Sequence, residues 1–246
     1  MAGRLMATLF ISDLHLEDKR PEITAILVNF LRGPARVAES LYILGDLFEF
    51  WIGDDVLAAT ATIVATELKL LSDSGVAVYF LHGNRDFLLG ESYARLAGIE
   101  LLPESLTVDL YGRPTLLLHG DSLCTGDVEY QAFRQQVRNP AFQAMFLGQS
   151  VEARLAMAAS ARDASKQHTG NADMAIMDVN ENAALDAFAQ AGTLHMIHGH
   201  THRPAVHQHH LNNGAVAERI VLADWYHSGS YLQVTAEGAI SKPLLA

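Results

Sequence analysis

Hydrophobic residues follow two different patterns in the first 120 positions of the chain. Nearly continuous apolar runs predict strands that are buried on both faces, at residues 6–11, 41–44, 76–81 and 115–118. Two longer segments, 22–31 and 56–71, carry apolar residues at helical spacing and stop before Gly33 and Gly75. Because strands and helices alternate, the pattern predicts an α/β fold with a mainly parallel sheet and helices on its faces.

A different pattern begins near position 127 and lasts to about position 191. This segment is nearly continuous helix by composition, with expected breaks at Asn139-Pro140 and in the polar stretch 165–173. Strand patterns then return at 194–197, 219–223 and 231–235, with a turn at Asn212-Asn213-Gly214. We therefore expect one domain over residues 1–246, with a helical cap inserted at about 127–191.

Composition and charge narrow the functional classes. The chain has 246 residues, of which 50% are hydrophobic and 18% charged, so it is expected to fold into a packed core. Its 17 basic and 28 acidic residues give a net charge of −11, which argues against general nucleic-acid binding. The early apolar run is too short for a membrane-spanning helix or a signal-peptide core, and the single cysteine, Cys124, cannot form an internal disulfide. These features favour the cytoplasm, and none indicates an obligate protein partner.

Metal-binding residue types follow five of the predicted strands. The motifs are Asp13-Leu14-His15, Gly45-Asp46, Gly83-Asn84-Arg85-Asp86, His119-Gly120 and Gly199-His200-Thr201-His202. Ligands of parallel sheets bind beyond the carboxyl ends of the strands, so we expect these residues to meet at one site. Their carboxylate, amide and imidazole groups suit Mn²⁺, Fe or Zn²⁺ better than Ca²⁺. Seven ligands are enough for two metals about 3.5–4 Å apart that share a carboxylate.

Together these motifs resemble the calcineurin-like metallophosphoesterases, which implies a β-sandwich flanked by helices. A finer resemblance is to the branch of this family that hydrolyses UDP-2,3-diacylglucosamine in lipid A biosynthesis. It is carried by Gly45-Asp46-Leu47-Phe48-Glu49-Phe50-Trp51, Gly83-Asn84-Arg85-Asp86-Phe87, Ile176-Met177-Asp178-Val179-Asn180 and His198-Gly199-His200-Thr201-His202-Arg203-Pro204. The resemblance implies a hydrolase that cleaves the diphosphate bond to UMP and 2,3-diacylglucosamine 1-phosphate by two-metal activation of water.

The resemblance also implies a role for each motif residue. One metal would be held by Asp13, His15, Asp46 and His202, and the other by Asp46, Asn84, His119 and His200, with Mn²⁺ as the expected ion. The implied catalytic residues are Asp46, Asn84, Arg85 and His119. The implied substrate contacts are Asn84, Arg85, Asp127, Ser165, Thr169 and His200. Thr169 and Ala172 stand where that branch usually has Asn and Lys.

Arg85 takes the place of a histidine found in many members of the wider family. A guanidinium stays protonated, so it can offset negative charge but cannot act as a general acid. It therefore favours a leaving group that needs no proton, such as a phosphate monoester with a second pKa of about 6. Together with the resemblance, this reasoning predicts pyrophosphate cleavage over hydrolysis of simple alkyl phosphates.

The predicted cap is locally basic and apolar. Residues 128–170 contain Arg134, Arg138, Arg154, Arg162 and Lys166, together with Phe133, Phe142, Met145, Phe146, Leu147, Leu155 and Met157. Such a cap would suit two acyl chains beneath an anionic head group, and would let the enzyme sit peripherally on the anionic cytoplasmic face of the inner membrane. Helix packing against the sheet is the alternative explanation for each apolar residue taken singly.

Two other functions stay open on the sequence alone. One is a related phosphoesterase that acts on a soluble nucleotide or phosphodiester, and the other is a non-catalytic scaffold that has lost its metals. A scaffold would lack ligands, and none of the seven is missing. Outside the motifs, His82 and His198 are expected to be hydrogen-bonded core residues, and His207, His209 and His210 to lie on a solvated strand face. Asp86 is expected either to orient Arg85 or a histidine ligand, or to stabilise a turn.

Overall fold

The computed structural model describes residues 6–171 and 178–244, with the backbone alone from 165 to 171. Its first sheet has the strand order β11-β10-β1-β2-β3-β4. The strands are β1 (Thr8–Ile11), β2 (Ser40–Ile43), β3 (Ala77–Phe80), β4 (Glu100–Leu101), β10 (Gly229–Thr235) and β11 (Gly238–Leu244). Strands β1 to β4 run parallel to one another, as the alternating pattern predicted. Strand β10 is antiparallel to β1, and β11 is antiparallel to β10.

A second sheet, with the order β5-β6-β7-β9-β8, faces the first. It contains β5 (Ser105–Leu110), β6 (Arg113–Leu118), β7 (His195–His198), β8 (Ala205–His210) and β9 (Val216–Val221). Strands β6, β7 and β9 are parallel, and β5 and β8 are antiparallel edge strands. Buried side chains from both sheets, among them Phe10, Leu44, Leu117, Ile197 and Leu232, form the core between them.

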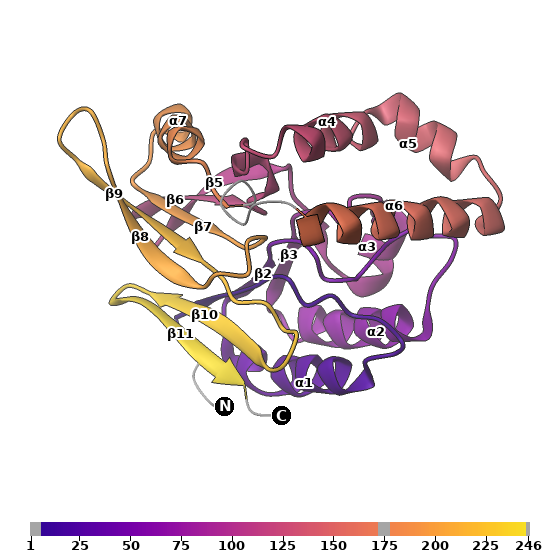
Figure 1. The fold of residues 1–246 in the computed structure, drawn as a ribbon. Helices are drawn as coiled ribbons and strands as arrows, with labels where there is room; N and C mark the ends of the chain where they lie inside the picture. The colour runs from indigo at the N-terminus through magenta and orange to yellow at the C-terminus, as the bar shows by residue number, and fades with distance from the viewer. Residues whose placement is uncertain (1–5, 172–177, 245–246) are drawn as a thin grey trace.

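Helices cover both outer faces, so the sandwich has four layers (Figure 1). On the first sheet lie α1 (Pro21–Arg32), α2 (Ala59–Asp73) and α3 (Glu91–Ala97), which bury a large apolar cluster. On the second sheet lies α7 (Glu181–Ala191), whose Phe188 packs with Met196 and Ala217. Short 3₁₀ turns, η1 (Pro34–Val37) and η2 (Asp121–Leu123), complete the elements near the sheets. The expected β-sandwich flanked by helices is confirmed.

The segment between β6 and β7 also contains α4 (Val128–Val137), α5 (Pro140–Leu147) and α6 (Val151–Asn171). Figure 1 shows α4 and α5 running away from the sandwich and α6 returning toward it. The break at Asn139-Pro140 is present, with the Asn139 side chain accepting a hydrogen bond from the Ala141 N–H. In the stretch 165–173, where a break was expected, α6 continues as far as Asn171, and residues 172 and 173 lie outside the described part of the chain. A polar composition without proline does not by itself end a helix.

The start of α2 also differs from the expectation at residue 56. The helix begins at Ala59. The backbone N–H of Thr60 lies in the first turn, where no helical carbonyl can accept it, and it donates to the Asp18 carboxylate at 2.8 Å. Asp18 lies 42 positions earlier, in the segment after β1. A long-range hydrogen bond therefore satisfies this helix terminus, which apolar periodicity does not indicate.

Candidate metal centre

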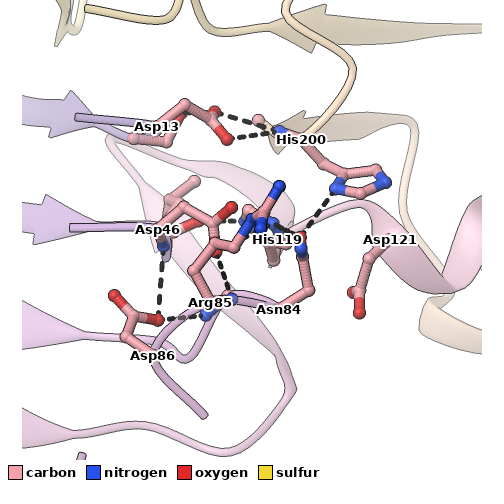
Figure 2. Close-up of polar contacts among 12 residues, drawn as sticks. Asp13, Asp46, Asn84, Arg85, Asp86, His119, Asp121 and His200 are labelled. Carbon is pink, nitrogen blue, oxygen red and sulfur yellow. Dashed lines mark hydrogen bonds and ion pairs between the residues drawn. The ribbon is translucent and has the colours of Figure 1, made fainter. Parts of the chain in front are cut away.

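All seven predicted ligands lie in loops that directly follow strands. Asp13 and His15 come after β1, Asp46 after β2, Asn84 after β3, His119 after β6, and His200 and His202 after β7. Because these strands are parallel within each sheet and the sheets face one another, their carboxyl ends meet at one end of the sandwich. Figure 2 shows five of these side chains from separate loops lying close together: Asp13, Asp46, Asn84, His119 and His200.

The first group of donors contains Asp13, His15 and His202, whose ligand atoms all lie within 4.8 Å of one another. The two Nε2 atoms of the histidines are 3.3 Å apart, and Nε2 of His202 is 3.3 Å from Oδ1 of Asp13. Asp13 and His15 are buried, whereas His202 is half-buried. Two ring nitrogens and a carboxylate oxygen therefore surround one small space.

The second group centres on Asn84. Its Oδ1 lies 2.9 Å from Nε2 of His119 and 2.9 Å from Nδ1 of His200. Nδ1 of His119 must donate its proton to the Leu44 carbonyl, 2.8 Å away, because a carbonyl can only accept. In its neutral form His119 therefore has the Nε2 lone pair on the side of Asn84, which is the form that binds a cation.

Asp46 lies between the two groups. Its Oδ2 is 3.8 Å from Nε2 of His15, and its Oδ1 is 3.7 Å from Nε2 of His119. Asp13, Asp46 and His119 also offer ligand atoms within 4.8 Å of one another, so Asp13 touches both groups as well. Each oxygen of one carboxylate thus faces a different histidine.

The electrostatics of the site are shaped by burial and by close opposite charges. Burial alone would raise the pKa of Asp13, but the hydrogen bond with His202 and the charge of His119 outweigh it and lower the pKa. Burial disfavours the charged form of His119, yet Asp46 and Asp13 raise its pKa. For His200 burial prevails, followed by repulsion from His119, and its pKa falls to about 4. Buried carboxylates that strengthen the protonation of neighbouring histidines mark a place that attracts positive charge.

The backbone is strained at the ligands themselves. Among the described residues, six that are not glycine have a positive φ, and five of these are predicted ligands: Asp13 at 56°, His15 at 50°, Asp46 at 51°, His200 at 68° and His202 at 54°. A non-glycine residue in this region costs on the order of 1–3 kcal/mol and persists where the surroundings enforce it. The strain therefore concentrates at the site.

Glycines next to the ligands provide the space for this close approach. A Cβ at Gly83 would overlap the carboxylate and the backbone nitrogen of Asp46. A Cβ at Gly199 would overlap the Asp13 carboxylate and the Ser12 hydroxyl. The donor types, their convergence and this packing fit divalent cations. The structure brings together every residue predicted to bind a metal.

Two carboxylates, at Asp86 and Asp121, support the loops. Asp86 is buried and accepts hydrogen bonds from the N–H groups of Leu47 at 2.7 Å and Gly83 at 2.9 Å, so it ties the β2 loop to the β3 loop. Asp121 accepts from the Tyr130 hydroxyl at 2.9 Å, which links α4 to the site. Of the two roles expected for Asp86, orienting another side chain or stabilising a turn, these hydrogen bonds correspond to the second. The position of Asp121, two residues after His119, was its only sequence signal.

The structure describes some of the predicted substrate-binding residues fully and others only in part. The backbone N–H of Arg85 donates to Oδ1 of Asp46 at 2.8 Å. Burial would raise the pKa of Glu49, a residue beside His15, but its interaction with His15 and then the charge of Arg85 lower it. Asp127 is buried and accepts from the Tyr130 N–H, so it caps α4. Ser165 and Thr169 lie on α6, but their side chains are outside the described part of the chain, and Ala172 lies outside the described residues altogether.

The remaining histidines divide into confirmed and corrected expectations. His198 is buried, its Nδ1 lies 2.8 Å from the Gly199 carbonyl, and its Nε2 lies 3.0 Å from Arg219, so it has the expected hydrogen-bonded core role. The solvated face expected for His209 is wrong: this residue is 2% exposed and lies between Glu181 and Arg219. Helix α7 covers that strand face, which the strand pattern alone does not reveal.

A mixed carboxylate, amide and imidazole donor set at the strand ends of a β-sandwich is typical of a metal-dependent enzyme. The family model for calcineurin-like phosphoesterases matches residues 6–204. The chain belongs to this family, which confirms the first resemblance seen in the sequence.

Curated relatives narrow the comparison. The chain is similar to a "UDP-2,3-diacylglucosamine hydrolase" of Stenotrophomonas maltophilia (strain K279a), with 55% identity over 95% of this chain and 96% of the relative. Proteins of the same name from Cellvibrio japonicus (strain Ueda107) and Escherichia fergusonii are 52% and 51% identical, over 95% and 94% of this chain and 97% and 96% of the relatives. The second, finer resemblance is thereby confirmed as well.

Proposed function

We propose that this chain hydrolyses the diphosphate bond of UDP-2,3-diacylglucosamine to UMP and 2,3-diacylglucosamine 1-phosphate in lipid A biosynthesis. The substrate is that named for relatives at 50% identity or more along almost the whole chain. The observation that supports the reaction type is the position of Asp46, with one carboxylate oxygen toward each histidine group. A carboxylate shared in this way suits a pair of cations.

In this proposal two Mn²⁺ ions occupy the centre. Asp13, His15, Asp46 and His202 would hold one ion, and Asp46, Asn84, His119 and His200 the other. Bound divalent ions would supply an activated water nucleophile and Lewis-acid stabilisation of the phosphoryl oxygens. Buried Asp13 and Asp46 give the pocket the negative charge that retains them.

The catalytic work of the chain's own residues is orientation and charge balance. Asn84 and His200 lie together, and we propose that both contact the reacting phosphate. The Arg85 guanidinium offsets negative charge on the equatorial oxygens of the attacked phosphorus, and the departing phosphate leaves as an anion that needs no proton. His119 is held through its Nδ1 by the Leu44 carbonyl, so its Nε2 keeps one orientation.

The cap would bind the acyl chains. Among the described cap residues, Phe133, Met145, Leu147, Leu155 and Met157 are exposed, and Val128 is 73% exposed. We propose that this apolar surface receives the lipid and rests on the cytoplasmic face of the inner membrane, and that Asp127, Ser165 and Thr169 contact the head group. Within residues 6–171 and 178–244, no helix has both the length and the apolarity needed to cross a bilayer.

The basic edge expected on the cap is smaller than the sequence suggested. Arg154 is 2% exposed and pairs with Asp55, so the expectation that it faces an anionic surface is wrong. Arg134 and Arg138 also pair with carboxylates of Asp121 and Glu104. Apolar contact therefore supports the membrane proposal more than charge does.

The test compares two substrates with added Mn²⁺. The wild-type chain is expected to release UMP from detergent-dispersed UDP-2,3-diacylglucosamine, and Asp46→Ala is expected to lose this activity. Product identity is checked by mass spectrometry. Activity on bis-p-nitrophenyl phosphate alone would instead support a phosphoesterase of soluble substrates, and activity on neither would support a non-catalytic scaffold.

A further inference from the structure

The imidazole of His15 has one nitrogen toward the metal centre and one away from it. Its Nε2 faces the donor atoms of His202 and Asp46, so Nε2 is the ligating nitrogen. A histidine that binds a cation through Nε2 keeps its proton on Nδ1, and that proton needs an acceptor. Nδ1 of His15 is buried and makes no hydrogen bond of good geometry among the described residues. A carboxylate oxygen, Oε2 of Glu49, lies 3.1 Å from this nitrogen.

Backbone pairing beyond the strands brings Glu49 to this position. After β1 and β2 end, the Leu16 N–H donates to the Leu47 carbonyl at 3.0 Å, and the Glu49 N–H donates to the Leu16 carbonyl at 3.1 Å. The two loops therefore continue side by side past the ligands. A modest turn of the Glu49 side chain would complete the hydrogen bond that the buried nitrogen lacks.

Tyr226 restrains the flat face of the same imidazole. Its ring stacks on His15 with centroids 5.1 Å apart and an interplanar angle of 5°, and it meets His202 edge-on at 5.3 Å. The tyrosine is itself fixed, because the Trp225 N–H donates to the Asp13 carbonyl and the Arg20 guanidinium donates to the Tyr226 carbonyl. One face of the His15 ring and its outer edge thus have neighbours that set its orientation.

We propose that Glu49 and Tyr226 are positioning residues for His15, and that they tune the affinity of one metal of the pair. The inference rests on the proposed two-metal site. Replacing a residue that holds a metal-binding histidine in this way typically lowers the metal affinity about 10–100-fold. The second ion, beside Asn84 and His119, has its own support through Leu44 and is expected to be unaffected.

The test measures Mn²⁺ bound per chain while a chelator buffer sets the free Mn²⁺ concentration. Glu49→Gln and Tyr226→Leu are each expected to bind one of the two ions about 10–100-fold more weakly than the wild type does, so that this ion dissociates at a correspondingly higher free Mn²⁺ concentration. The affinity for the other ion should not change. Electron paramagnetic resonance should show the spin-coupled pair giving way to an isolated ion. Tyr226→Phe keeps the stacked ring and should bind like the wild type.

Glu17→Gln is the matched control, because Glu17 lines the same hollow of about 690 Å³ beside His15 and Tyr226. Wild-type affinity for both ions in Glu49→Gln and Tyr226→Leu would overturn the inference, as would an equal loss in Glu17→Gln. A wild-type chain that holds fewer than two ions at saturation would overturn the two-metal site and this inference together. Two ions in the wild type with unchanged variants would overturn the inference alone.

Discussion

Replacing Arg154 by methionine should release α6 from the body of the protein. Among residues 151–164, all of which the structure describes, Arg154 is the only buried one. Its Nη1 donates to the Ile52 carbonyl at 2.6 Å and to Asp55 Oδ1 at 2.7 Å, and its Nη2 donates to the other oxygen of Asp55. This single side chain therefore anchors the helix to the loop after β2.

The magnitude follows from the exposure of each partner. Asp55 is 61% exposed on its side chain, so its ion pair is discounted to about 0–1 kcal/mol. The Ile52 carbonyl is at a buried residue, and leaving such an acceptor without a partner costs about 1–3 kcal/mol. We expect a total of about 1–4 kcal/mol, which is roughly a 5- to 900-fold increase in the opening of α6.

Hydrogen exchange followed by mass spectrometry measures this opening. Amides of residues 151–164 should exchange faster in Arg154→Met, while those of α1 stay unchanged. Arg95→Met is the control, because Arg95 is 71% exposed and lies 3.9 Å from Glu91 in a surface pair. Unchanged exchange in α6, or equal acceleration in α6 and α1, would refute the anchoring role of Arg154.

Three further predictions concern the site and its surroundings. Arg85→Ala should lower kcat/KM for the diphosphate substrate at least about 30-fold, or about 2 kcal/mol, with a smaller loss contradicting its role in charge stabilisation. Gly199→Ala should reduce bound Mn²⁺, measured by mass spectrometry, because the new Cβ overlaps Asp13; full metal content would disprove this. Burial and Arg219 lower the pKa of His198 to about 3, so the folded chain stays neutral there while the unfolded chain takes up a proton below about 6.5. The free energy of unfolding, measured with urea, should therefore fall as pH drops from about 6.5, and it should fall less steeply with pH in His198→Gln. An equal dependence on pH in the two proteins would contradict this prediction.

Local sequence patterns predicted much of the sandwich. Strands β1, β2, β3 and β6 lie where continuous apolar runs occur, and β1 is buried along its whole length, which requires such a run. The ligands were also found locally, since each follows a strand directly and carries a distinctive donor group. By contrast, the pairing of β10 with β1, and the division into two sheets, depend on contacts between distant segments.

The supporting contacts of the site could not be predicted in the same way. Glu49 and Tyr226 are separated by most of the chain, and they meet at His15 only because the loops after β2 and β9 converge on it. Likewise, Arg154 looked like a surface charge by its type, but docking of α6 buried it against Ile52 and Asp55.

The amino-acid sequence by itself determined the elements and the kinds of donor atoms at their ends, because periodicity and residue chemistry are local properties. Only the tertiary structure decided which oxygen of Asp46 faces which histidine, and which neighbours hold those histidines in place. The physical reason is that orientation, burial and charge compensation arise when separate segments pack together, and they are not properties of any one segment.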